Sequence, residues 1–217
     1  MTFPGHTPKA AAGSDRDTSP WRSPAGAALT WIALVAIAVA GRAWQPTWHG
    51  EPLWHATPLA GVALAAGFVF PNAVVAASVP LVALAIGNLA LPGYGSLAIA
   101  AVVYAATAWP VLLGTAGILG RSRPRWMAVI GGSLATSLVF FLSTNLAHWA
   151  FRSDYPHTAS GLAACFAAAL PFHRWMPVGD VAWTLAVFGL LAAVQAVADA
   201  TAGRRLHPQP VSTRTLD

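Results

Sequence analysis

Residues 57–71, TPLAGVALAAGFVFP, form an uncharged apolar segment, and the fold depends on whether this segment crosses a membrane. A helix needs about 20 mostly apolar residues to span the core of a bilayer, and this segment offers fewer. Residues 160–172, SGLAACFAAALPF, form a second apolar segment that is shorter still. The number of membrane crossings therefore depends on which of these two segments spans.

The overall composition indicates an integral membrane protein. Of the 217 residues, 56% are hydrophobic and 9% are charged, whereas a soluble domain usually carries about 25% charged residues. The first long apolar segment spans if the side chain of Arg42 reaches the membrane interface. The segments long and apolar enough to span are 25–44, 73–91, 96–119, 126–147 and 178–200. The sequence therefore predicts an all-α membrane protein.

The basic residues favour one arrangement of the two short segments. Lys and Arg collect in the cytoplasmic loops of membrane proteins. If 57–71 spans and 160–172 only dips into the membrane from outside, nine basic residues lie inside and three lie outside; if both span, the numbers are seven and five. The nine are Lys9, Arg16, Arg22, Arg121, Arg123, Arg125, Arg204, Arg205 and Arg214, and the three are Arg42, Arg152 and Arg174. We predict about six spanning helices, one re-entrant or interfacial helix, and two cytoplasmic termini.

The expected organisation is a single transmembrane domain, residues 25–200, between two polar tails. Residues 1–24 are rich in Pro, Ser and Asp and lack the apolar core of a cleavable signal peptide, which predicts a disordered cytoplasmic tail. Residues 201–217 form the second cytoplasmic tail. The net charge of +5 comes with no nucleic-acid-binding motif, so we expect the lipid bilayer, and not nucleic acid, as the partner of the basic residues.

Polar side chains concentrate at the predicted outer surface, above all in FFLSTNLAHWAFRSDYPHTASG, residues 140–161. Asn145, His148 and Trp149 are spaced i, i+3 and i+4, which places them on one face of a helix. An amide without a partner in an apolar run costs free energy, so Asn145 is expected to bond another helix or a ligand. Asn88 lies in another apolar segment and has the same two interpretations.

A second polar stretch, PFHRWMPVGD at residues 171–180, is predicted to face the first across one pocket. The short segment 160–172 links the two and is too short to carry the chain across the bilayer and back. Asp180 begins the last predicted helix, where it either caps that helix or supplies a counter-charge for Arg174 or a cationic ligand. The predicted ligand-binding residues are Asn145, His148, Trp149, His173, Asp180, Asn88 and Tyr94.

Other chemistries remain open at this surface. His55, His148, His157 and His173 are potential metal ligands, although no pair has the i, i+4 spacing of a helical zinc motif. An enzyme would need an acid–base pair, for which His148 with Asp154 or Asp180 is the candidate. No cofactor motif is present, and the single cysteine, Cys165, excludes an intrachain disulfide.

Five stretches resemble an uncharacterised family of bacterial membrane proteins over roughly residues 55–190. They are ATPLAGVALAAGFVFPN, VPLVALAIGNLAL, FFLSTNLAHWAF, YPHTASGLAACFAAALPF and VGDVAWTLAVFG. The chain departs from that pattern at Asn88, where the family has Asp. The resemblance implies a multi-pass protein of the bacterial inner membrane and carries no established activity.

The layout is also similar to the S components of energy-coupling-factor vitamin transporters. Those are six-helix proteins with a small ligand pocket near the outer surface, and they dock on an energising ATPase module through an Ala-xxx-Ala stripe. The similarity implies a docking role for Ala36 and Ala40 on the first helix. We therefore expect a solute-binding transporter subunit with an outward-facing pocket. The alternatives are a membrane-embedded enzyme and a structural membrane subunit without a small-molecule ligand.

Overall fold

The computed structural model describes residues 19–44, 47–52, 56–89 and 93–206, and within them the chain is almost entirely helical. Loops and turns connect the helices, and the described strands form one hairpin of two short antiparallel strands, β1 (Thr47–Trp48) and β2 (Glu51–Pro52). The helices are η1 (Pro20–Arg22), α1 (Pro24–Ala43), α2 (Leu59–Val69), α3 (Ala73–Asn88), α4 (Leu97–Ala108), α5 (Val111–Thr115), α6 (Trp126–Phe151), α7 (Ala159–His173) and α8 (Met176–Leu206). The predicted all-α class is confirmed, whereas His55, residues 1–18 and residues 207–217 lie outside the described part of the chain.

Among the described residues, four helical segments are long and apolar enough to cross a membrane: Pro24–Ala43, Leu97–Thr115, Trp126–Phe151 and Met176–Gly203. α2 and α3 are shorter, with 11 and 16 residues. The predicted segment 96–119 is not one continuous helix, because the chain turns at Trp109 and Pro110 between α4 and α5. Pro110 has no N–H to continue the hydrogen-bond ladder of α4.

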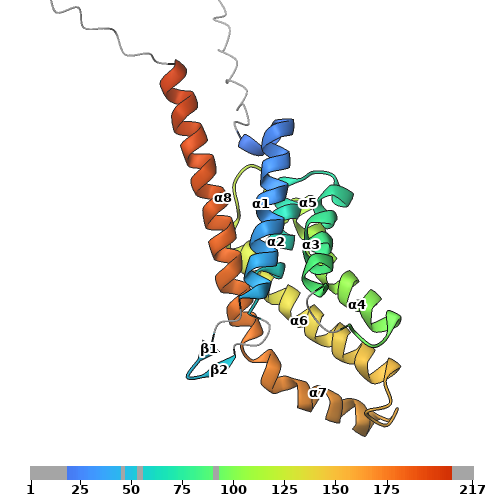
Figure 1. Cartoon of the computed structure of the whole chain (residues 1–217). Coiled ribbons are helices and arrows are strands. Elements are labelled where there is room, and N and C mark those ends of the chain that lie inside the picture. Colours follow the sequence, from blue (N-terminus) through green and yellow to red (C-terminus); the bar gives the residue numbers. More distant parts are fainter. Residues whose placement is uncertain (1–18, 45–46, 53–55, 90–92, 207–217) are drawn as a thin grey trace, which may run out of the picture.

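The helices run back and forth between two ends of the molecule (Figure 1). The start of α1 and the end of α8 lie at one end, while α7 and the β1–β2 hairpin lie at the other. Arg22 and Arg121 line one cavity together with Pro71, so the turn after α2 and the loop before α6 are at the same end as η1. We call this the arginine end, and the opposite end the α7 end.

α2 is the central helix of the bundle. Nine of its 11 residues are buried, and it packs against α1, α3, α5, α6 and α8. Two glycines permit this close packing. A Cβ on Gly61 would lie 2.8 Å from the Thr184 Cα of α8, and one on Gly67 would lie 2.2 Å from the Val111 carbonyl oxygen of α5. Small residues in this way let neighbouring backbones approach without lipid between them.

α7 lies across one end of the bundle, whereas the other long helices run along it (Figure 1). Thr158 caps its first turn by accepting a hydrogen bond from the Gly161 N–H at 3.1 Å. Gly161 is needed there because a Cβ would lie 2.0 Å from the Pro156 carbonyl oxygen. The exposed apolar side chains of Leu170 and Phe172 suit a helix at a membrane surface.

Candidate functional site

A buried carboxylate, Asp180, lies within the helix bundle near the start of α8. α8 begins at Met176, one turn before Asp180, so the sequence-based expectation that Asp180 begins this helix is wrong by one turn. The side chain is 2% exposed. Its Oδ2 accepts a hydrogen bond of 2.5 Å from the Ser137 hydroxyl of α6. A neutral hydroxyl is a weak partner for a carboxylate removed from water, which makes Asp180 a candidate functional group.

Asp180 and Arg42 line the same cavity, which has a volume of about 60 Å³. Threonine side chains of three segments contribute hydroxyl groups: Thr57 before α2, Thr107 of α4 and Thr136 of α6. Within the described residues, no ion pair joins Arg42 to Asp180. We call this space the inner chamber. It therefore has an arginine and a carboxylate at its wall that do not neutralise each other directly.

Arg42 is held in this position by a network around Asn88. Its Nη2 donates to Asn88 Oδ1 at 2.9 Å, and the Tyr94 hydroxyl donates to the same oxygen at 3.1 Å. Asn88 Nδ2 in turn donates to the Tyr104 hydroxyl at 3.3 Å. Gly87 leaves room for the Arg42 side chain, since a Cβ there would lie 2.6 Å from Arg42 Cδ. The Arg42 side chain thus bonds to α3 within the protein, and its position at a membrane interface stays a prediction.

The network leaves one nitrogen of Arg42 available. Arg42 Nε is buried and has no hydrogen-bond partner among the described residues. Burying an N–H donor without a partner costs free energy comparable to a lost hydrogen bond. This nitrogen lies against Gly87 of α3, since a Cβ there would be 2.6 Å from Arg42 Nε.

A second space, which we call the outer chamber, adjoins the first. It lies between α6 and α7, has a volume of about 180 Å³ and includes Asn145 and His173 in its wall. Phe140 and Met176 line both chambers. The structure thus brings Asn145 and His173 to one cavity and places Asp180 and Arg42 at the neighbouring one.

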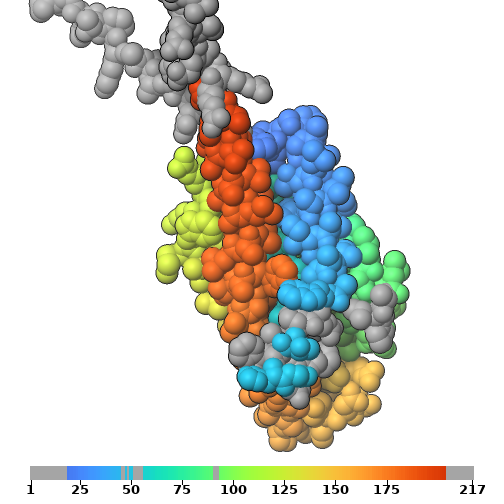
Figure 2. Space-filling model, turned by 60° about the vertical axis from the view of Figure 1, so that its left-hand side comes forward, coloured from blue at the N-terminus to red at the C-terminus, as the bar shows by residue number. Residues whose placement is uncertain are grey.

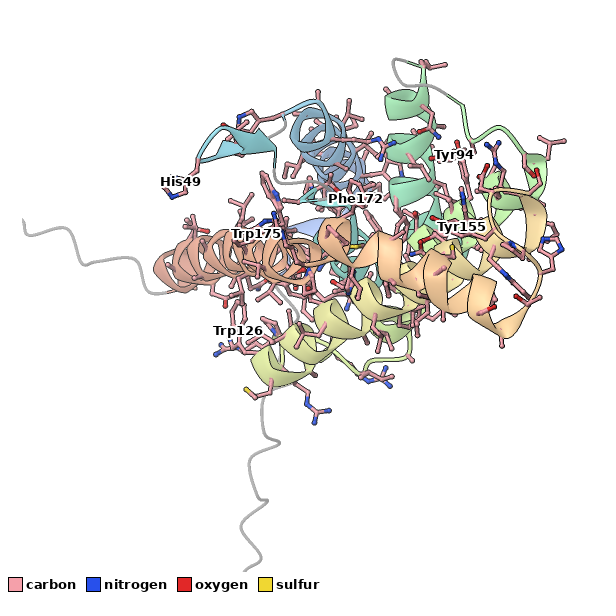
Figure 3. All side chains as sticks on the ribbon, turned by 90° about the horizontal axis from the view of Figure 1, so that it is seen from below. His49, Tyr94, Trp126, Tyr155, Phe172 and Trp175 are labelled. Atoms are coloured by element: carbon pink, nitrogen blue, oxygen red, sulfur yellow. The ribbon has the colours of Figure 1, made fainter. Side chains whose placement is uncertain are left out.

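The side chains at the outer chamber are held mainly by local contacts. Asn145 Nδ2 donates to the Phe141 carbonyl oxygen of its own helix at 2.7 Å, so this amide hydrogen bond does not link two helices. The His173 ring stacks on Phe141 with ring centroids 4.2 Å apart. His173 Nδ1 is buried and has no partner among the described residues. In the end view of Figure 3, Phe172, the neighbour of His173, lies close to the middle of the molecule.

His148 and Trp149 lie away from both chambers, at the turn between α6 and α7. His148 Nε2 is 3.0 Å from Asp154 Oδ2, and Trp149 Nε1 donates to the Pro156 carbonyl oxygen at 2.9 Å. These contacts stabilise the turn, and both members of the His148–Asp154 pair are partly exposed. Of the three residues predicted to share one helix face, Asn145 thus lines a chamber, whereas His148 and Trp149 contact the turn between α6 and α7.

The polar residues of the α7 end do not form one cluster. Figure 3 shows His49 and Tyr155 on opposite sides of the molecule. Among the described residues, no group of three or more His, Cys, Asp or Glu side chains is arranged to hold a metal ion. On α1, Ala36 and Ala40 are exposed on the surface of the bundle.

Sequence reasoning missed Arg42, Ser137, Thr107 and Thr136 as residues of the site. One signal was present: Arg42 is the only charged residue in the apolar segment 25–44. A charged side chain within a membrane segment is by default a candidate functional residue. The hydroxyl residues gave no signal, since Ser and Thr are common in membrane helices and often bond to their own backbone, as Thr136 does.

Lowering the pH is expected to destabilise the protein through His173. Burial lowers the pKa of His173 from its ordinary value of 6.5. The folded state therefore holds this ring neutral, and its contribution to stability is full above pH 6.5 and is lost as the pH falls through the lowered pKa. Melting temperatures between about pH 5 and pH 7.5 should decline less steeply in His173→Gln than in the wild type. Parallel declines in the two proteins would contradict this assignment.

Comparison with known proteins gives one match. No curated protein and no solved structure matches the chain. A family model does match, over residues 23–202, and this range includes every residue of the two chambers. The family carries no assigned activity, which agrees with the resemblance found in the sequence. The chain belongs to the family of unknown function DUF6580.

Proposed function

We propose that this protein binds a small polar solute between Arg42 and Asp180, as the solute-binding subunit of a membrane transport system. The observation that carries the proposal is that an arginine and an aspartate line one cavity without an ion pair between them. An ionisable residue inside a membrane protein is costly and usually marks a substrate path. The solute would present an anionic group or acceptor to Arg42 and a cationic group or donor to Asp180.

The outer chamber extends this site towards the α7 end. Because Phe140 and Met176 line both chambers, a solute larger than the inner chamber requires these two side chains to move. The walls are otherwise largely apolar, with Asn145, Thr144 and His173 as the polar groups. Apolar walls with a few placed polar groups are typical of small-molecule sites.

We further propose six membrane crossings with the arginine end in the cytoplasm. α2 is too short to cross lipid by itself, but it is surrounded by other helices, where a short helix is tolerated. α7 would then lie at the outer surface, and both chain termini would be cytoplasmic. The basic loop Arg121–Arg125 and Arg22 at one end support this orientation.

The orientation predicts the behaviour of two reporter fusions. A reporter that is active only outside the cytoplasm should be inactive when fused after residue 205, because the proposed orientation places that residue in the cytoplasm. The same reporter inserted between Asp154 and Tyr155, in the exposed turn between α6 and α7, should be active. Activity after residue 205 would contradict six crossings.

A transport role requires a partner, because the sequence contains no nucleotide-binding motif to supply energy. We propose an energising membrane or ATPase module for this purpose. The exposed small side chains of Ala36 and Ala40 on α1 offer a surface on which another helix can approach closely.

The binding proposal is tested by identifying small molecules that purify with the protein. Mass spectrometry of protein in mild detergent should detect one solute in the wild type, with loss of that solute in Arg42→Gln. Arg174→Gln is the matched control, because Arg174 is an exposed arginine at the same end that stacks on Trp175 and lines neither chamber. No solute in any preparation, or equal amounts in all three, would contradict the proposal.

The His148–Asp154 distance of 3.0 Å favours a membrane-embedded enzyme as the second candidate. A carboxylate that orients a histidine is a recurrent general-base arrangement. Under this alternative, His148→Gln abolishes turnover of a lipid or peptide substrate while solute binding in the chambers is unaffected. Under the transport proposal, His148→Gln leaves solute binding and uptake unchanged.

A further inference from the structure

A cavity at the arginine end lies apart from the proposed solute site. Its volume is about 300 Å³. It is enclosed by the second half of α8, the segment before α6, the end of α2 and Trp21 of η1. Figure 2 shows this part of the chain, in yellow-green, against the upper half of α8. The residues in its wall are Trp21, Phe68, Ser122, Arg123, Pro124, Trp126, Phe188, Leu191, Ala192, Gln195, Ala196 and Asp199.

The wall of this cavity has an apolar part and a polar rim. Trp21, Phe188 and Leu191 form the apolar part and are at most 8% exposed. Ser122 and Arg123 form one side of the rim, and Gln195 and Asp199 of α8 form the other. An apolar space that opens between groups of both charge signs matches the chemistry of a lipid with a zwitterionic headgroup.

The first turn of α6 adds to the attraction for an anion. α6 begins at Trp126, which lines the cavity, and no side chain caps this helix. Backbone N–H groups at an uncapped helix start favour a phosphate group. Ser122 and Arg123 line the same cavity as Trp126 of this first turn, so a hydroxyl, a guanidinium and a helix start belong to neighbouring residues of its wall.

Under the proposed six crossings, the rim lies near the headgroup level of a bilayer. α6 and η1 both begin there, and two tryptophans, Trp21 and Trp126, are in the wall. Tryptophan is enriched at the boundary between lipid tails and headgroups. Basic pockets between helices at this level are recognised sites for phospholipid headgroups.

A groove for an acyl chain continues from the cavity. It lies between α1 and α8, has a volume of about 310 Å³ and shares Trp21 and Leu191 with the cavity. Its other wall residues are almost entirely apolar, among them Leu29, Ile37 and Val187. In Figure 2, α1 and α8 lie side by side along this face.

We propose that this cavity binds a zwitterionic aminophospholipid. Its phosphodiester contacts Arg123, the Ser122 hydroxyl and the first N–H groups of α6, its ammonium lies on the Asp199 side of the rim, and an acyl chain follows the groove between α1 and α8. Asp199 accepts a hydrogen bond from Gln195 Nε2 at 2.8 Å, and in this proposal its carboxylate at the rim also disfavours a headgroup with net negative charge. The lipid would join α8 to η1 and α6 at the arginine end.

The test measures lipid binding by native mass spectrometry of delipidated protein in detergent. Three probes with identical acyl chains are added: phosphatidylethanolamine, phosphatidylglycerol and diacylglycerol. Phosphatidylethanolamine should bind best, and Arg123→Gln should weaken it about tenfold, as expected for one charge-assisted hydrogen bond. Arg125→Gln is the matched control, because Arg125 is an exposed arginine two residues away that does not line the cavity.

Two further results decide the proposal. Ala192→Phe fills the cavity from α8 and leaves every arginine in the sequence. It should also weaken the binding of phosphatidylethanolamine, and it keeps the test decisive if Arg123→Gln fails to fold. Equal binding of diacylglycerol would overturn the proposal, since that lipid lacks the phosphate. A preference for phosphatidylglycerol that Arg123→Gln and Arg125→Gln reduce equally would also overturn it, because general attraction to the basic loop explains that result.

Discussion

Gly67→Ala is expected to lower the free energy of unfolding by roughly 3 kcal/mol, the upper part of the range for overpacking a tightly packed interior. A Cβ at this position would lie 2.2 Å from the Val111 carbonyl oxygen and 2.9 Å from its carbonyl carbon. These are backbone atoms of α5, so no side chain can rotate away to make room. α2 and α5 would have to separate, which opens packing at the centre of the bundle.

Thermal unfolding in detergent or denaturation with increasing sodium dodecyl sulphate measures this effect. Gly131→Ala is the matched control, because Gly131 also lies in a helix and a Cβ there meets nothing within 4 Å. Its effect should remain within about 0.5 kcal/mol, as for most surface substitutions. Gly114, whose Cβ would lie 2.2 Å from the Gly67 carbonyl carbon, should be as sensitive as Gly67. Equal stability of Gly67→Ala and Gly131→Ala would contradict the close approach of α2 and α5.

Asp180→Asn is expected to reduce solute affinity about tenfold or more while the protein stays folded, because one charged contact is typically worth at least that factor. Asparagine has nearly the same shape, and its side-chain oxygen still accepts from the Ser137 hydroxyl. The substitution therefore removes the charge at the inner chamber and little else. Removing a poorly compensated buried charge leaves stability unchanged or raises it.

Thr184→Val separates this functional role from a structural one. Thr184 lies one turn further along α8 and donates to the Ser133 hydroxyl of α6 at 3.1 Å, so it joins the same two helices as Asp180 does. It lines neither chamber. We expect Thr184→Val to cost about 1 kcal/mol of stability and to leave solute binding intact. If Asp180→Asn instead destabilises the protein and leaves binding intact, the structural-subunit alternative is favoured.

Sequence reasoning located the helices well and the lateral contacts poorly. The segments 25–44 and 160–172 correspond closely to α1 and α7, because an apolar run between polar residues is a local property of the chain. The break at Pro110 was also local, and the rule that proline interrupts a helix would have found it. For Asp180 the error was a single turn, and Pro177 was a signal for the earlier start of α8 at Met176, because proline is favoured in the first turn of a helix.

The site itself shows where local reasoning ends. Asn88 and Tyr94 were selected as single residues, but the sequence did not indicate that Arg42, 46 positions before Asn88, would bond to it. His148 shares a helix face with Asn145 by spacing, yet it turns to Asp154 because the chain reverses direction just after α6. A three-residue spacing fixes the direction of a side chain around a helix, whereas the following turn decides what lies in that direction.

The sequence by itself determined that this chain is all-α, that it has helices long and apolar enough to cross a membrane, and that it belongs to its family, since composition, apolar run length and motif order are local properties of the chain. Only the tertiary structure decided that the short segment α2 lies at the centre and that Arg42 and Asp180 share a cavity. The physical reason is that lateral packing depends on which small residues meet. Gly61, Gly67 and Gly87 look alike in the sequence. Only the assembled helices show that they contact α8, α5 and Arg42, respectively.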